Sequence, residues 1–139
     1  MLKKHVFILI CCLFHVISFA QKEATEKNAA DSVGKANSKT LYGIASFYAE
    51  KFNGRKTANG EIYDSKKFTA ACNVLPLGTW IRVTNTRNKK TVIVKVNDRL
   101  HPRMKRIVDL SRAAAEKLGY IGRGLTQVKV EVLGKKKPA

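Results

Sequence analysis

The chain has 139 residues, of which 27 are Lys or Arg and 10 are Asp or Glu, giving a formal net charge of +17. This length predicts at most one domain with short appendages. The charge indicates an anionic environment, and the absence of aromatic residues interleaved with basic ones argues against a single-strand nucleic-acid binder.

The first twenty residues are typical of a secretory signal peptide. Two lysines precede an apolar run at residues 6–19, which is too short to span a bilayer comfortably. Ser18 and Ala20 place small residues at the −3 and −1 positions of a cleavage site. An uncleaved anchor is the alternative. A lipoprotein is disfavoured because Ile10 stands where a small residue would precede the lipidated cysteine.

Cleavage after residue 20 predicts an exported protein of the periplasm or cell envelope, without a stable membrane anchor. It leaves 25 basic and 10 acidic residues, a formal charge of +15, and Cys72 as the remaining cysteine. A single cysteine excludes an internal disulfide bond. Export makes nucleic acid a poor partner and favours anionic lipid or an anionic cell wall. A basic surface that only keeps the protein soluble is the other interpretation.

The rest of the chain predicts a mainly β domain at residues 40–134, between a flexible linker at 21–39 and a basic tail at 135–139. Period-two alternation and apolar runs predict short extended segments at residues 40–49, 68–72, 79–85, 92–98, 107–110 and 125–133. Residues 111–119 predict a short helix, capped by Ser111 or Asp109 and ended by Gly119. About six strands with one or two short helices suggest a closed or nearly closed barrel of unknown strand order.

Two aspartates, Asp98 and Asp109, stand at the ends of two extended segments, eleven residues apart and flanked by arginines. This arrangement can hold two carboxylates near each other at the mouth of a small β structure.

A series of short motifs, in order and at matching spacing over residues 42–133, resembles the rare-lipoprotein-A family. The matching runs are GIASFY at 43–48, GR and TANGEIYD within 54–64, TAA at 69–71, LPLGT at 75–79, RVTN at 82–85, VNDR at 96–99, RIVDLS at 106–111, AAA at 113–115 and LG at 118–119. The resemblance implies a six-stranded double-psi β-barrel, the fold shared with expansins. It also implies lytic cleavage of the MurNAc–GlcNAc bond of peptidoglycan, which leaves a 1,6-anhydro end without adding water.

The same resemblance implies the site residues. The catalytic candidates are Asp98, Glu61 and Asp109, and the candidate contacts to sugar or carboxylate are Thr57, Asn59, Cys72, Arg99, His101 and Arg106. Three of these have structural alternatives: Asp109 as the helix cap, Glu61 as a solvated loop acid and Arg106 as an ion-pair partner of either aspartate. No metal or cofactor is expected, because a carboxylic acid can both donate and accept the proton.

The chain departs from the family at two places. Cys72 stands where the family usually has histidine, and Leu100, His101 and Pro102 replace a Gly-Pro-aromatic sequence after Arg99. Cysteine cannot carry the charge of an imidazole. His101 either replaces the missing imidazole or is an exposed loop residue. Two hypotheses follow: a monomeric lytic transglycosylase acting on peptidoglycan glycan strands, or a non-catalytic, expansin-like module that binds or loosens the wall.

Overall fold

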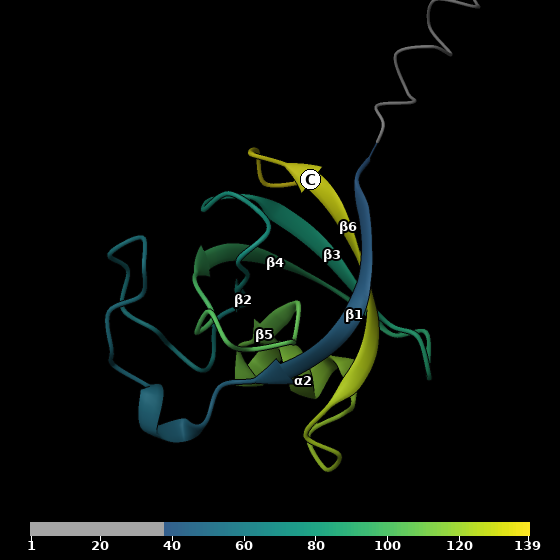
Figure 1. The fold of residues 1–139 in the computed structure, drawn as a ribbon, viewed down its shortest axis with the longest axis horizontal. Coiled ribbons are helices and arrows are strands. Elements are labelled where there is room, and N and C mark those ends of the chain that lie inside the picture. Colours follow the sequence, from purple (N-terminus) through teal and green to yellow (C-terminus); the bar gives the residue numbers. More distant parts are fainter. Residues whose placement is uncertain (1–37) are drawn as a thin grey trace, which may run out of the picture. The chain divides into compact units, whose positions relative to one another are not determined.

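The computed structural model describes residues 38–139, so the expected signal peptide and nearly all of the expected linker lie outside the described residues. Six strands close into a barrel in the order β1-β5-β2-β4-β3-β6 (Figure 1). The strands are β1 (Thr40–Phe47), β2 (Thr69–Ala71), β3 (Trp80–Asn85), β4 (Thr91–Asp98), β5 (Val108–Leu110) and β6 (Thr126–Gly134). The predicted mainly β, six-stranded barrel is confirmed.

The barrel interior is built by the alternation that the sequence shows. Val92, Val94 and Val96 of β4 are all buried, and β3 and β6 also place alternate apolar residues inward. Removing this apolar surface from water is the main stabilising contribution to a small domain without disulfide bonds. No helix among residues 38–139 is long and apolar enough to cross a membrane.

Two parallel strand pairs, β1 with β5 and β2 with β4, join segments that are far apart in the sequence. The other four pairs of the barrel are antiparallel. The long connection between β1 and β2 extends to one side of the barrel (Figure 1). It begins with the 3-10 helix η1 (Glu50–Phe52), so the first strand ends at Phe47, two residues earlier than predicted.

The predicted helix forms as α2 (Arg112–Leu118) and packs against β4 and β1. Its cap is Ser111, whose Oγ accepts a hydrogen bond from the backbone N–H of Ala114 at 3.4 Å. Gly119 ends the helix with φ of 75°, a left-handed conformation that glycine adopts without strain. The alternative in which Asp109 caps the helix is therefore wrong, and the Asp109 carboxylate is engaged elsewhere.

Candidate active site

The barrel places the two aspartates in one row of residues that crosses four neighbouring strands. Ala71 of β2 pairs with Asp98 of β4 on one side and with Asp109 of β5 on the other, and Asp109 pairs in turn with Ser46 of β1. Two strand spacings of about 4.8 Å put the Cα atoms of the aspartates roughly 10 Å apart. Ala71 carries only a methyl group, so it leaves the space between the aspartates open.

This row forms part of the wall of a cavity of about 470 Å³. Of the predicted site residues, six line it: Thr57, Asp98, Arg99, His101, Arg106 and Asp109. Glu61, Asn59 and Cys72 are not among the lining residues. The remaining lining side chains include an aromatic group, Phe47, Tyr48, Phe52 and Tyr63. The cavity therefore combines two carboxylates, basic residues and apolar ring faces, which suits a sugar-containing ligand.

The Asp98 carboxylate accepts three hydrogen bonds. The Tyr48 hydroxyl donates a hydrogen bond to Oδ2 at 2.6 Å. The backbone N–H groups of Ala58 and Arg99 donate hydrogen bonds to Oδ1 at 2.9 and 2.8 Å. These donors come from the residue after β1, from the long loop and from the residue after β4, so three segments fix the orientation of the carboxylate. Burial, and next the hydrogen bond to Asp98, raise the pKa of Tyr48, so this phenol remains a proton donor at neutral pH.

Tyr48 is a site residue that the sequence interpretation missed. Its ring stacks on Tyr63 at a centroid distance of 4.4 Å and meets Phe52 edge-on at 5.9 Å. These contacts hold the phenol against Asp98. The signal in the sequence was a polar ring within an apolar, extended segment, but no local pattern pairs this ring with a residue fifty positions later.

Asp109 forms a bidentate ion pair with Arg106. The Arg106 Nε and Nη2 atoms donate to the two carboxylate oxygens at 2.8 and 3.0 Å. The hydrogen bond to Asp109 raises the pKa of Arg106. The sequence left Asp98 and Asp109 as possible ion-pair partners of Arg106, and the structure shows that the partner is Asp109.

The Arg99 guanidinium contacts backbone rather than carboxylate. Its Nη1 atom donates to the carbonyl oxygens of Cys72 and Leu75, the latter at 2.7 Å. These bonds tie the segment after β2 to the end of β4.

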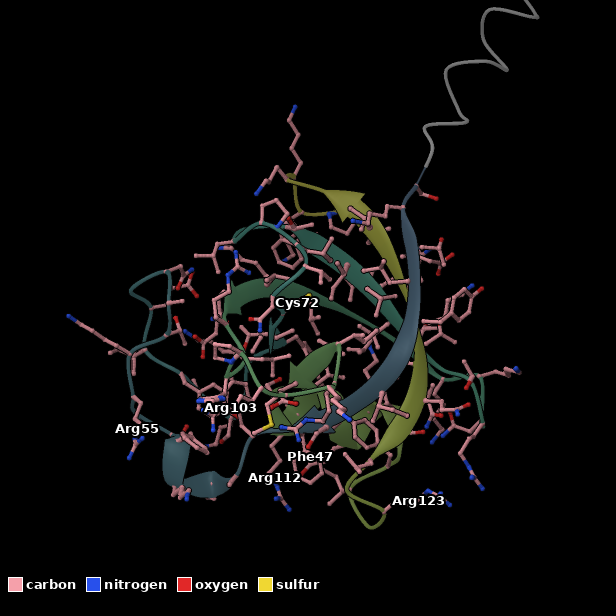
Figure 2. All side chains as sticks on the ribbon, in the orientation of Figure 1. Phe47, Arg55, Cys72, Arg103, Arg112 and Arg123 are labelled. Carbon is pink, nitrogen blue, oxygen red and sulfur yellow. The ribbon has the colours of Figure 1, made fainter. Side chains whose placement is uncertain are left out.

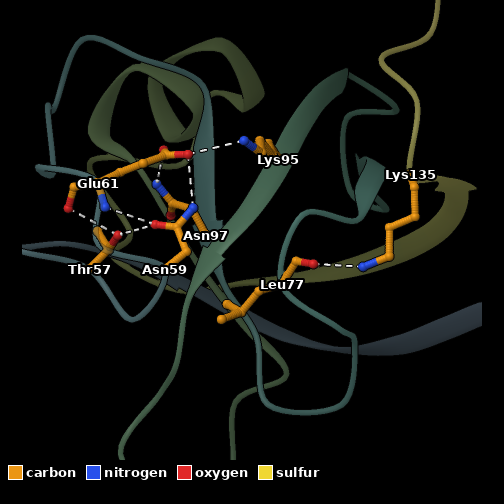
Figure 3. Close-up of polar contacts among 7 residues, drawn as sticks. All are labelled: Thr57, Asn59, Glu61, Leu77, Lys95, Asn97 and Lys135. Carbon is orange, nitrogen blue, oxygen red and sulfur yellow. Dashed lines mark hydrogen bonds and ion pairs between the residues drawn. The ribbon is translucent and has the colours of Figure 1, made fainter.

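Glu61 contacts three side chains, as Figure 3 shows. Its carboxylate accepts hydrogen bonds from Asn59 at 2.8 Å, from Lys95 at 3.0 Å and from Asn97 at 3.1 Å. The Asn97 amide is the largest cause that lowers the pKa of Glu61, followed by Lys95. Because Lys95 and Asn97 belong to β4, Glu61 links β4 to the loop whose Ala58 N–H group reaches Asp98.

The lowered pKa of Glu61 predicts a pH-dependent loss of stability in Glu61→Gln. A carboxyl group whose pKa is lower in the folded than in the unfolded state stabilises the fold at pH values above its unfolded pKa, which is about 4.3 for glutamate. This stabilisation is lost as the pH falls through the folded-state pKa. The melting temperature of Glu61→Gln should therefore lie below that of the parent at pH 7 and converge with it at acid pH. Thermal unfolding across this range measures the effect, with Glu116→Gln as control for an exposed ion pair. An equal deficit at every pH would contradict the assignment.

Cys72 and His101 occupy different environments. Cys72 is 2% exposed and belongs to the barrel core, whereas His101 is exposed at the rim of the cavity. Figure 2 shows Cys72 within the outline of the barrel and Arg55, Arg112 and Arg123 at its periphery. Within residues 38–139 no three His, Cys, Asp or Glu side chains gather to form a metal-binding group.

Comparison with known proteins identifies the family. The model of the lytic transglycolase family matches residues 40–130. The chain belongs to the lytic transglycolase family. This match agrees with the resemblance that the sequence motifs showed.

Several curated relatives carry the name endolytic peptidoglycan transglycosylase RlpA. The one from Pasteurella multocida is 56% identical over 92 residues, which cover 66% of this chain and 31% of the relative. The one from Haemophilus influenzae is 49% identical over 102 residues, covering 73% of this chain and 36% of the relative. The chain thus spans about a third of the length of these relatives.

Solved structures show the same fold at low identity. A Streptomyces papain inhibitor has a TM-score of 0.56 at 22% identity, covering 68% of this chain and 94% of its own. The apo expansin of Clavibacter michiganensis has a TM-score of 0.57 at 24% identity, covering 73% and 52%. These likenesses support the double-psi β-barrel fold alone.

Proposed function

We propose that this lytic transglycolase family member is exported and cleaves the MurNAc–GlcNAc bonds of peptidoglycan, leaving 1,6-anhydro ends. The observation that carries the proposal is the Asp98 carboxylate, held by three donors in the wall of a cavity that also holds Asp109. The family match and the relatives' printed names support the substrate class and a place of action in the cell envelope.

In the proposed reaction Asp98 first donates a proton and then accepts one. Its carboxyl group donates a proton to the glycosidic oxygen of the leaving sugar, and the resulting carboxylate then accepts the proton of the 6-hydroxyl group. That hydroxyl oxygen forms the new bond to the anomeric carbon, so no water enters. Asp109, on the other side of Ala71, is the supporting carboxylate for positive charge that develops on the sugar.

The other predicted residues fall into two groups in this proposal. Thr57, His101 and Arg106 line the cavity and contact the glycan strand. Glu61 and Asn59 act through the loop, because they hold Ala58 where its N–H group reaches Asp98. Arg99 fixes the segment after β2 and with it the cavity wall.

A non-catalytic wall-binding module is the second candidate, favoured by the buried Cys72 at the position of the family histidine. Digestion of purified peptidoglycan followed by mass spectrometry separates the two functions. Anhydro-muropeptides in the digest support the enzyme. Protein that pellets with a chemically unchanged wall supports the binding module.

The burial of Cys72 predicts that restoring the family histidine destabilises this chain. The Cys72 side chain packs in the core, so the larger imidazole of Cys72→His overpacks it and costs about 1–3 kcal/mol of unfolding free energy. Urea unfolding of Cys72→His measures the loss, and Cys72→Ala is the control for removing the thiol. A Cys72→His protein as stable as the parent would show that the core has room for the ring.

The positive charge predicts that wall binding weakens with salt. The proposed mature chain carries +15, and exposed charge interactions weaken as the Debye length falls from about 10 Å at 0.1 M salt to about 3 Å at 1 M. Co-sedimentation with peptidoglycan across this range should show a steady fall in affinity. The same affinity at both ends of the range would contradict an electrostatic contribution.

A further inference from the structure

A second hollow lies on the outside of the barrel, apart from the carboxylate row. It has a volume of about 650 Å³, and Phe68, Trp80 and Ile93 provide its apolar floor. Lys67, Lys95 and residues 137–139 form its rim. We call this feature the lysine groove. It shares no lining residue with the cavity at Asp98.

In and beside the groove, lysine ammonium groups lie close to the faces of aromatic rings. Phe68 is 44% exposed, and the Lys117 ammonium lies 5.5 Å from the centre of its ring. The Lys137 ammonium lies 6.0 Å from the centre of the half-buried Trp80 ring. Exposed aromatic groups of this kind mark interaction sites more often than isolated apolar residues do.

The charge of the groove is largely unneutralised. Lys95 pairs with Glu61 at 3.0 Å, but no ion pair within residues 38–139 involves Lys67, Lys117 or Lys137. Lysines arranged around apolar rings complement a ligand that carries both carboxylates and flat apolar faces. The C–H face of a sugar ring packs on an indole or phenyl ring, and an ammonium group binds a carboxylate.

The position of the groove on β4 favours a polymer as its occupant. Ile93 and Lys95 line the groove, and the same strand ends at Asp98. Three residues of strand span about 10 Å, so one extended chain can engage both places.

From these observations we propose that the lysine groove is a second binding site for the carboxylate-bearing glycan of the cell wall. Trp80 and Phe68 stack on sugar rings. Lys67 and Lys137 at the rim, and Lys117 beside the Phe68 ring, bind the carboxylates. The site holds the wall polymer while another part of it enters the cavity at Asp98. This inference rests on the proposed function for the identity of the polymer.

Co-sedimentation with purified peptidoglycan sacculi tests the site, with every variant made in an Asp98→Asn background so that turnover does not consume the ligand. Trp80→Ala should weaken binding about tenfold, the effect of removing one aromatic anchor. Lys137→Gln should weaken it about threefold, the effect of removing one exposed charge pair with a ligand carboxylate. Sacculi with amidated carboxyl groups should bind parent and Lys137→Gln protein equally.

Two matched controls separate the groove from general surface effects. Tyr42 is an aromatic residue 70% exposed on β1, and Lys136 is the neighbour of Lys137 that does not line the groove. Tyr42→Ala and Lys136→Gln should bind sacculi as the parent does. Circular dichroism confirms folding of each variant, and Lys137→Gln keeps the test valid if Trp80→Ala does not fold.

The outcomes distinguish this site from the proposed enzyme. If folded Trp80→Ala and Lys137→Gln bind sacculi as the parent does, the lysine groove is not a glycan-binding site, even where the parent protein releases anhydro-muropeptides. Equal loss in the Tyr42 and Lys136 controls overturns the groove as well. So does Trp80-dependent binding that is tighter to vesicles of phosphatidylglycerol and phosphatidylcholine in equal parts than to sacculi. Trp80-dependent binding, combined with no anhydro product from the protein that keeps Asp98, supports the groove and contradicts the enzyme instead.

Discussion

Asp98→Asn should lower the rate of anhydro-muropeptide release by about 10²–10⁴-fold, the contribution of a positioned acid or base. The amide has nearly the shape of the carboxyl group. Its one oxygen can still accept the hydrogen bonds from the backbone N–H groups of Ala58 and Arg99, while its NH2 group can donate to the Tyr48 hydroxyl. The amide cannot donate the proton to the leaving sugar and take another from the 6-hydroxyl. Initial rates on purified peptidoglycan measure the loss, while co-sedimentation should show nearly parental binding.

Asp64→Asn is the matched control, because Asp64 lies outside the cavity and its carboxylate accepts a hydrogen bond from the backbone of Lys66 at 2.9 Å. This variant should digest peptidoglycan at the parental rate. An Asp98→Asn protein that is folded and fully active would contradict the proposed role of Asp98.

Tyr48→Phe should lower the same rate by about ten- to a hundredfold. A hydrogen bond to a charged group contributes about 1.5–3 kcal/mol, and 1.4 kcal/mol in a barrier is a tenfold change in rate. The phenylalanine ring keeps the stacking on Tyr63, so the aromatic wall of the cavity remains. The carboxylate of Asp98 loses one of its three donors and with it part of its fixed orientation. The effect should appear in kcat, with binding to sacculi unchanged.

Tyr120→Phe tests whether any buried hydroxyl would do the same. The Tyr120 hydroxyl donates to the backbone oxygen of Ser46 at 2.8 Å, and burial and next the charge of Asp109 raise its pKa, but it does not line the cavity. This control should cost stability and leave kcat nearly intact. Equal rates for Tyr48→Phe and the parent would assign Tyr48 to packing alone.

The sequence predicted those parts of the fold that depend on local pattern. The alternating valines of β4 and the Ser111–Gly119 helix follow from side-chain periodicity and capping chemistry, which are properties of short segments. The strand order depends on parallel pairing between segments such as β1 and β5, which no local period encodes. The row that sets Ala71 between Asp98 and Asp109 exists only once that order is known.

The candidate site shows the same division. The motifs indicated Asp98 and Asp109, and the barrel brings both to one cavity. They did not indicate that Glu61 contacts Lys95 and Asn97 instead of lining that cavity, because the irregular loop that carries it has no periodicity to interpret. The roles of all three acids remain predictions.

Digestion of peptidoglycan in water labelled with heavy oxygen tests the proposed lytic reaction most directly. In that reaction the 6-hydroxyl oxygen of the sugar itself closes the new ring. We therefore expect products with unlabelled 1,6-anhydro ends, formed by the parent protein and missing from the Asp98→Asn digest. Reducing ends that carry the heavy oxygen would show hydrolysis by water and would contradict the account.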